Sequence, residues 1–229
     1  MPAQRFAQGI TDGFLNVSAS NVSDACDRLS IKGAVQGILP LFPCPKIVGH
    51  AATLKLTKPG GAAKLSPTDG TFLAVEAGGP GAVFVIDSHD SPTVSCMGGI
   101  AGATAKHGGY VGCVADGIVR DVDEYKGYGL PVYARGINQQ SVRGRSVVEG
   151  YSIPVQLGGV TVNPNDLIFA DDNGVVVVPR DQAEEVLRLA LIIKATEDRV
   201  IAAVRSGERA LDVMKKIDYD NLTKRTPQS

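Results

Sequence analysis

The stretch that decides the fold is AKHGGYVGCVADGIVRDVDEY, which covers residues 105–125. Its apolar run from Tyr110 is typical of a strand buried on both faces. The preceding residues 98–106, GGIAGATAK, predict a glycine-rich turn that opens a helix of small residues. A second continuous apolar run, Ala82–Ile86, predicts a buried strand before that turn. The order strand, turn, helix, strand predicts an α/β fold.

Upstream of this unit, residues 18–30 place apolar side chains at helical spacing behind Ser18 or Ser20 as a cap, which predicts a short helix. From Ile47 the pattern alternates through Leu54 and Leu56, as in a half-buried strand. The segment Pro59–Gly70 is rich in Gly, Pro and Ser and is expected to be a loop.

Downstream, residues 167–178 predict two strands joined at Asp171–Gly174. Apolar positions from Asp181 to Arg205 fit one long amphipathic helix, about residues 181–206, capped by Asp181 and closed near Gly207. The tail after Asp218 is polar. No internal repeat or linker divides the chain, so a single domain over residues 1–229 is expected.

Composition excludes several classes of function. The 23 basic and 24 acidic residues leave a net charge of −1, so no broad basic surface for nucleic acid or anionic lipid is expected. No apolar run approaches the roughly 20 residues of a membrane span. Because the N-terminus lacks the features of a signal peptide, a cytoplasmic location is expected. Cys26, Cys44, Cys96 and Cys113 form no CxxC pair and are expected to be core residues.

Two segments that flank the strand from Tyr110 contain candidate chemistry. A turn such as Gly98–Ala101 at a helix start presents backbone N–H groups that suit a carboxylate or phosphate, although most such turns are only turns. Arg120 offers a fork of donors for substrate oxygens, while Asp121 and Glu124 are hard oxygen ligands for Mg²⁺ or Mn²⁺. A solvated turn with a surface ion pair is the alternative interpretation of these charges.

The run at residues 105–125 resembles that of the RraA-like / 4-hydroxy-4-methyl-2-oxoglutarate (HMG) aldolase family. Further segments resemble the family in the same order and extend the resemblance over roughly Leu15–Leu211. They are VSDACDRL, GILPLFPCPKIVGHAAT and GGVTVNPNDLIFADDNGVVVVPR.

The resemblance implies an αββα sandwich of the RraA-like / phosphohistidine-domain type, assembled as a homotrimer or a homohexamer with active sites between subunits. It implies that a pyruvate unit binds at Gly98, Gly99, Ile100 and Ala101, with Ile100 and Ala101 donating their amides. Arg120 would contact the substrate oxygens, and Asp121 would hold the cation. A glutamate from the neighbouring subunit's last long helix completes the family's site, and Glu197 is the residue whose position fits.

One departure concerns position 99, where the resembling aldolases carry Asp or Glu and this chain has Gly99. The loss of one carboxylate should weaken cation binding unless Glu124, Asp116 or water takes its place. Returning an acidic residue to position 99 is expected to tighten the metal, if the backbone there admits a side chain.

The expected activity is that of a class II, divalent-metal-dependent carbon–carbon lyase acting on a pyruvate-type 2-oxo acid. Retro-aldol cleavage of a 4-hydroxy-2-oxo acid and decarboxylation of oxaloacetate both remain open, because both form an enolate. Decarboxylation needs no base and so tolerates a degraded site better. A Schiff base on Lys106 is a different route to the same electron sink. A non-catalytic RraA-like regulator that binds a protein partner is the alternative from another class.

Overall fold

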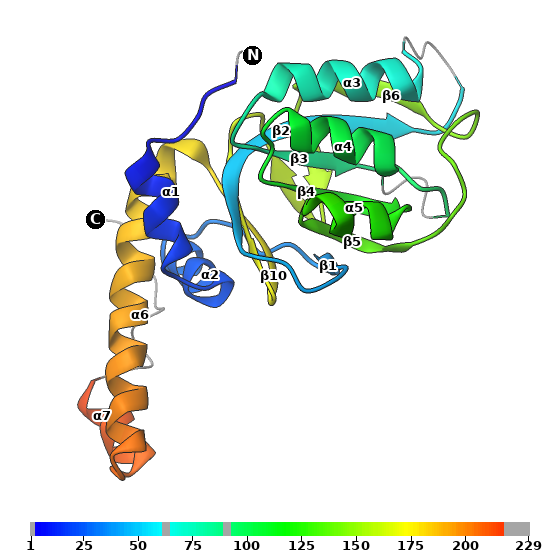
Figure 1. Cartoon of the computed structure of the whole chain (residues 1–229). Coiled ribbons are helices and arrows are strands. Elements are labelled where there is room, and N and C mark those ends of the chain that lie inside the picture. Colours follow the sequence, from blue (N-terminus) through cyan, green and yellow to red (C-terminus); the bar gives the residue numbers. More distant parts are fainter. Residues whose placement is uncertain (1–2, 61–64, 89–92, 218–229) are drawn as a thin grey trace.

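The structure, a computed structural model, describes residues 3–60, 65–88 and 93–217 (Figure 1). Its main element is an eight-stranded mixed sheet in which four strands, β2 to β5, run parallel. β6 (Val147–Tyr151) pairs antiparallel with β2 outside the main path. In spatial order the other strands are β1 (Leu39–Pro40), β5 (Val132–Ile137), β4 (Gly112–Val119), β3 (Ala82–Asp87), β2 (Ile47–Thr57), β9 (Leu167–Asp171) and β10 (Gly174–Val178).

Three helices cover one face of the parallel strands (Figure 1). They are α3 (Pro67–Gly78), α4 (Gly99–His107) and α5 (Val122–Tyr128). Phe84 and Ile86 on β3 point into this layer and pack with Tyr110 and Tyr125. Because side chains alternate along a strand, their neighbours Val83 and Val85 point to the opposite face.

On that opposite face, Val83 and Val85 pack against β9, β10 and a small second sheet. This two-stranded sheet consists of β7 (Val155–Leu157) and β8 (Val160–Val162). β9 and β10 thus contribute Ile168 and Val177 to the inner core, while Phe169 and Val176 point outward.

The outward side of β9 and β10 is covered by α1 (Gln8–Leu15), α2 (Ala19–Arg28) and α6 (Ala183–Arg205). A short 3₁₀ turn, η1 (Arg180–Gln182), precedes α6, and α7 (Ala210–Lys216) follows it. Three apolar clusters therefore lie between four layers in the order helix, strand, strand, helix. This confirms the expected α/β fold with αββα layering.

The parallel arrangement determines where a site can form. The carboxyl ends of β2, β3, β4 and β5 lie at one edge of the sheet, where connections to the covering helices gather. The N-termini of α3, α4 and α5 are at that same edge, since each helix follows its strand. Side chains distant in sequence therefore meet there.

Several local predictions hold. Ser18 caps α2 by accepting a hydrogen bond from the Asn21 amide. The strand β3 before residue 98 and the helix α4 after it form as expected. The hairpin joins β9 to β10 through Asp172 and Asn173. The long helix ends at Arg205, just before Gly207, whose φ is +98°.

Other predictions were wrong. The segment Pro59–Gly70 is not wholly a loop: α3 begins at Pro67, and the Ser66 side chain caps it by accepting from the Asp69 amide. β2 is almost wholly buried rather than half-buried, because it lies centrally in the sheet. Asp181 does not cap α6; it lies within η1, and the N-cap Gln182 makes no side-chain cap bond. The helices α1 and α7 were not expected, and the polar tail after Asp218 lies outside the described residues.

Within the described ranges, no helix combines the length and apolar character that crossing a bilayer requires.

Candidate active site

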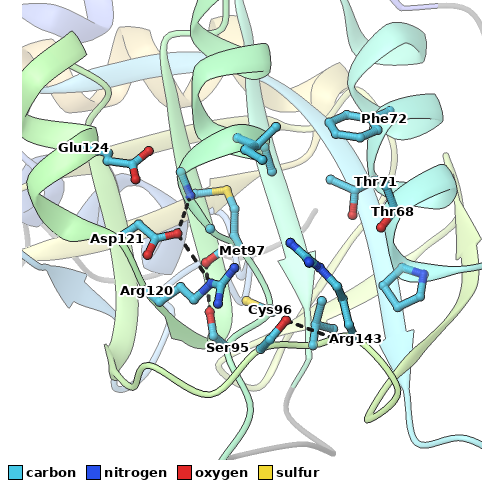
Figure 2. Close-up of a pocket in the computed structure, with 17 residues that line it drawn as sticks. Thr68, Thr71, Phe72, Ser95, Cys96, Met97, Arg120, Asp121, Glu124 and Arg143 are labelled. Atoms are coloured by element: carbon cyan, nitrogen blue, oxygen red, sulfur yellow. Dashed lines mark hydrogen bonds and ion pairs between the residues drawn. The ribbon is translucent and has the colours of Figure 1, made fainter.

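A cavity of about 420 Å³ lies at the carboxyl ends of the parallel strands (Figure 2). Four segments line it, each following a different parallel strand. They are the first turns of α3 (residues 67–72), the turn before α4 (95–101), the start of α5 (120–124) and the loop after β5 (141–143). This one space is bordered by all the residues that were predicted from the sequence to bind substrate. It is also bordered by two of the three residues that were predicted to bind metal.

Arg120 and Asp121 occupy the junction between β4 and α5. The Arg120 amide donates to Met97 O at 3.1 Å, which joins the two loops. Asp121 adopts the left-handed conformation, with φ 61° and ψ 40°, which Asp tolerates better than most residues. Its Oδ2 accepts from the Gly99 amide at 2.8 Å and lies 3.4 Å from Arg120 Nε. The Asp121 carboxylate is thus oriented by both neighbours.

The turn at Gly98 and Gly99 starts α4 beside this pair. The first helical hydrogen bond runs from the Gly102 amide to Gly98 O at 3.1 Å. The amides of Ile100 and Ala101 precede it and so lack an intrahelical acceptor. Tyr128 donates its hydroxyl hydrogen to Gly99 O at 3.0 Å and fixes the turn from the other side. Two N–H groups are therefore available to an anion in the cavity.

Glycine is needed at both positions because other side chains approach closely, and not because of the backbone angles, since neither residue has a positive φ. A Cβ added at Gly98 would lie 2.8 Å from Asp121 Oδ2 and 2.9 Å from Arg120 Nε. A Cβ added at Gly99 would overlap the carboxylate of Glu124. Gly99 thus leaves open the space that Glu124 occupies.

Glu124 fits a role as cation ligand. Its carboxylate borders the cavity and makes no hydrogen bond or ion pair with any residue in the described part of the chain. No group of three His, Cys, Asp or Glu side chains suited to a metal occurs among residues 3–60, 65–88 and 93–217. A cation bound by this chain alone would therefore have Asp121, Glu124 and water as ligands. Asp116 cannot serve, because its carboxylate is buried against Arg135 and the Gly158 amide.

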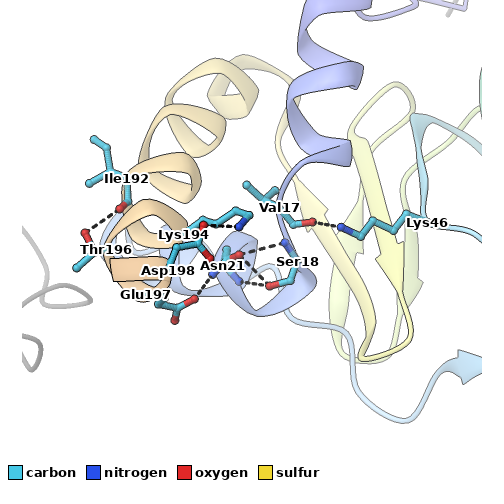
Figure 3. A network of polar contacts seen from close by, with 9 residues as sticks. All are labelled: Val17, Ser18, Asn21, Lys46, Ile192, Lys194, Thr196, Glu197 and Asp198. Carbon is cyan, nitrogen blue, oxygen red and sulfur yellow. Dashed lines mark hydrogen bonds and ion pairs between the residues drawn. The ribbon is translucent and has the colours of Figure 1, made fainter. Parts of the chain in front are cut away.

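Glu197 lies elsewhere in its own chain. It is on α6, and its Oε2 accepts from Asn21 Nδ2 at 2.7 Å (Figure 3). It does not border the cavity, to which α6 contributes no lining residue. Burial and then the nearby Glu197 charge raise the pKa of Asp24 on α2. Within this chain the structure therefore does not bring Glu197 to Asp121.

Two alternative nucleophiles find no support. Lys106 is in the last turn of α4, where its Nζ donates to Gly129 O at 2.7 Å, and it does not line the cavity. Cys96 does line the cavity, but burial raises the pKa of its thiol to about 12, which keeps it protonated at neutral pH. Cys26 and Cys113 are buried as expected, while Cys44 is only half-buried.

Sequence reasoning missed the residues that α3 and the loop after β5 contribute. These include Thr68, Thr71, Phe72, Ser141 and Arg143. The sequence Ser66-Pro67 with Asp69 was an available sign of a helix start. No local pattern distinguishes Arg143 from Arg145 two residues later.

Comparisons with known proteins identify the family. The family described as "RraA-like: Aldolase/RraA" matches residues 19–177. Protein DlpA of Legionella pneumophila is 33% identical over 84% of this chain, which spans only 31% of that protein. A Halalkalibacterium halodurans protein named "Putative 4-hydroxy-4-methyl-2-oxoglutarate aldolase" is 29% identical, with 86% of this chain and 90% of that protein covered.

Among solved structures, Streptomyces coelicolor RraAS2 superimposes with a TM-score of 0.77 at 27% identity, covering 86% of this chain and 98% of that one. The matched residues include β4, the Arg120–Asp121 pair and the whole cavity lining. The chain therefore belongs to the RraA-like family.

Proposed function

We propose that this protein is a class II, divalent-metal-dependent carbon–carbon lyase that acts on a pyruvate-type 2-oxo acid. One observation supports this above all: the Ile100 and Ala101 amides, the Arg120 guanidinium and the Asp121 and Glu124 carboxylates border one cavity. Donors for an anion and ligands for Mg²⁺ or Mn²⁺ thus stand side by side, as a chelating 2-oxo acid requires.

Each residue has a distinct task in the proposed reaction. The amides at the start of α4 bind the substrate carboxylate. Arg120 lies beside the 2-oxo group and stabilises the negative charge that develops on its oxygen when a bond at C3 breaks. Asp121 and Glu124 hold the cation, which when bound supplies Lewis-acid chemistry to the 2-oxo group. The Gly99 amide keeps the Asp121 carboxylate oriented toward that position.

Retro-aldol cleavage and decarboxylation differ in one requirement. Cleavage of a 4-hydroxy-2-oxo acid needs a base for the hydroxyl proton, whereas decarboxylation of oxaloacetate does not. The cavity lining contains no histidine, so a water held by the carboxylates is the proposed base. Oxaloacetate decarboxylation is the less demanding of the two reactions.

The proposed assembly is a homotrimer or homohexamer with sites between subunits. Glu197 does not line the cavity of its own chain, so its proposed role as a metal ligand requires a neighbouring copy. Exposed apolar side chains on α6, including Ile192 and Ile201, are consistent with burial between copies.

The second candidate is a non-catalytic regulator that binds a protein partner. The likeness to RraAS2, described as an unusual member of the RNase ES inhibitor RraA protein family, favours it. The presence of Gly99 in place of an acidic residue also favours the regulator. The oriented Arg120–Asp121 pair favours the lyase, since a binding surface alone would not need it.

Release of pyruvate from oxaloacetate, and from a 4-hydroxy-2-oxo acid, with Mn²⁺ or with EDTA tests the proposal. We expect metal-dependent release, and a loss of about a hundredfold or more in Arg120→Ala that added metal does not reverse. Arg145→Gln, which removes an equal charge outside the cavity, should retain activity. Release at wild-type rates by Arg120→Ala would favour the regulatory alternative.

A further inference from the structure

A second cavity, of about 320 Å³, lies at the amino ends of the parallel strands. It borders the start of β2 and the residues that directly precede β3 and β4, which are Gly81 and Val111. The N-terminal segment and α1 form its outer wall. The first cavity lies at the carboxyl ends of the same strands, and the two have no lining residue in common. The second cavity is therefore a separate candidate site.

Backbone contacts hold the N-terminal segment at this second cavity. The Gln4 amide donates to Asn165 Oδ1 at 2.9 Å. Arg180 donates to Gln4 O at 2.8 Å and to Arg5 O at 3.0 Å. The Arg180 Cζ also lies 4.3 Å from the centroid of the Phe6 ring. Since terminal segments are ordered mainly where they are tied down, these contacts keep Arg5 and Phe6 in place without using the Arg5 side chain.

His50, on β2, supplies a hydrogen-bond acceptor to the cavity wall. Its side chain is buried, and its Nε2 lies 3.0 Å from Gly78 O. Because a carbonyl oxygen can only accept, Nε2 must carry the hydrogen. Burial lowers the pKa of His50, against the effect of this hydrogen bond, so the ring is neutral at pH 7. The other ring nitrogen, Nδ1, therefore carries a lone pair.

The lone pair of His50 Nδ1 is open to a ligand. Nδ1 makes no hydrogen bond with any residue in the described ranges. Within those ranges, the side-chain atoms that lack both a partner and contact with solvent are the hydroxyls of Ser88, Tyr125 and Tyr133. His50 Nδ1 is not one of them, so it remains accessible although the residue is buried. A hydrogen-bond donor in the second cavity can therefore pair with it.

The charges of the lining favour a monoanion. Among the described residues that line the second cavity, the charged side chains are Arg5, Asp12 and Lys46, which sum to +1. Asp12 Oδ1 accepts from Gln8 Nε2 at 2.7 Å, and Lys46 Nζ donates to Val17 O at 2.6 Å (Figure 3). The Arg5 guanidinium makes no hydrogen bond or ion pair with a residue in the described part of the chain. Arg5 is thus the charged group that a ligand can engage.

The donor that pairs with His50 is more favourably a hydroxyl than an ammonium group. The charges of Arg5 and Arg180 both act on His50 and lower its pKa further. The same two charges would repel a cation placed beside the ring. A neutral donor on an otherwise anionic molecule suits both ends of the cavity.

The size and walls of the cavity limit the rest of the ligand. At the roughly 30 Å³ that one liquid water occupies, the second cavity holds about ten heavy atoms. Apolar side chains form part of its wall, and they are Phe6, Leu15, Val48 and Val111. They suit a short hydrocarbon segment between the anionic end and the donor.

We propose that the second cavity is a binding site for a small monocarboxylic acid that carries a hydroxyl group on an apolar chain. Arg5 binds the carboxylate, and His50 Nδ1 accepts a hydrogen bond from the hydroxyl. The apolar side chains of the wall contact the chain between them.

Nitrogen NMR of the full chain, labelled at histidine, tests the inference with three matched probes. 6-Hydroxyhexanoate has both groups, hexanoate lacks the hydroxyl, and 1,6-hexanediol lacks the carboxylate. 6-Hydroxyhexanoate should shift the His50 Nδ1 signal to saturation and bind at least about threefold more tightly than hexanoate, as expected for one net hydrogen bond. 1,6-Hexanediol should bind about tenfold more weakly, because it cannot form the charge-assisted contact with Arg5. His89→Gln and His107→Gln identify the signals of the other two histidines.

Variants of Arg5 test the anionic end of the site. Arg5→Gln should weaken 6-hydroxyhexanoate binding about tenfold and leave the fold unchanged, because Arg180 holds the Arg5 backbone and not its side chain. Arg5→Lys should recover part of the affinity, since it keeps the charge but lacks the bidentate fork. Arg205→Gln removes an equal charge at the end of α6 and should bind as the wild type does.

Three outcomes would each overturn the inference. They are the lack of a saturable Nδ1 shift at tens of millimolar 6-hydroxyhexanoate, equal binding of this probe and either analogue, and unchanged affinity in Arg5→Gln. Neither His50 nor Arg5 borders the first cavity, so these measurements are independent of the lyase proposal.

Discussion

The carboxylate of Glu124 fills the space that a side chain at position 99 would occupy. Gly99 and Glu124 are therefore mutually dependent: a larger residue at 99 would force Glu124 to move. The backbone at Gly99 admits a side chain, so the obstacle to Gly99→Asp is Glu124 and not the turn. The expectation that Gly99→Asp alone tightens the metal is accordingly replaced by a paired substitution.

Glu124→Ala is expected to weaken Mn²⁺ binding about 10- to 100-fold, since it removes one of two carboxylates at the cavity. Gly99→Asp in that background returns a carboxylate to the vacated space and should recover most of the affinity. Gly99→Asp alone should not improve on wild type. Mn²⁺ titration followed by electron paramagnetic resonance measures all three, and wild-type affinity in Glu124→Ala would exclude Glu124 as a ligand.

Asp121 is expected to have separable structural and charge roles. Asp121→Ala removes the acceptor of the Gly99 amide and places Ala in a left-handed conformation, so unfolding should cost about 2 kcal/mol less. Asp121→Asn keeps an acceptor and tolerates the conformation, so it should lose less than about 1 kcal/mol. Both variants should need more Mn²⁺ for activity. Urea denaturation measures the stability of each variant, and metal titration measures its Mn²⁺ requirement. Equal loss of stability in the two variants would contradict the separation of roles.

Subunit mixing tests the shared site. If Arg120 and Glu197 act across an interface, mixed oligomers of Arg120→Ala and Glu197→Gln subunits contain some sites with both native residues. Activity should return to at most about a quarter of wild type for random mixing in a closed ring. A mixture of Arg120→Ala with Asp121→Asn should show no activity beyond that of the two variants measured separately, because those residues share a subunit. Light scattering that shows a monomer at micromolar concentration would end the shared-site proposal.

The raised pKa of Asp24 leads us to expect that the stability of the protein depends on pH. Its pKa is raised by burial and by the Glu197 charge, so the folded state prefers the protonated carboxyl. This preference stabilises the protein at low pH and is lost as pH rises through the raised pKa. Asp24→Asn should therefore raise the free energy of unfolding at pH 7, by up to about 1 kcal/mol, and not at pH 3. Glu76→Gln, at an exposed position of α3, is the charge-matched control for thermal unfolding at both pH values.

The local elements followed from the sequence wherever one physical pattern dominated. β3 and β4 are continuous apolar runs, and α4 opens at a glycine turn, so each could be predicted from its own residues. α3 was hidden because its glycines and proline are typical of a loop. Only the Ser66 cap and the proline at the first helical position indicated a helix.

The meeting of Arg120, Asp121 and the turn before α4 was also contained in the sequence, since both segments flank one parallel strand. What the sequence could not determine is which residues complete the cavity. Arg143 and Thr71 reach it only because four parallel strands place their carboxyl ends at one edge, and that depends on pairing between distant segments. Gly99 and Glu124 show the same limit. Their separate residue types were visible, but only tertiary packing puts the carboxylate of one into the space left by the other.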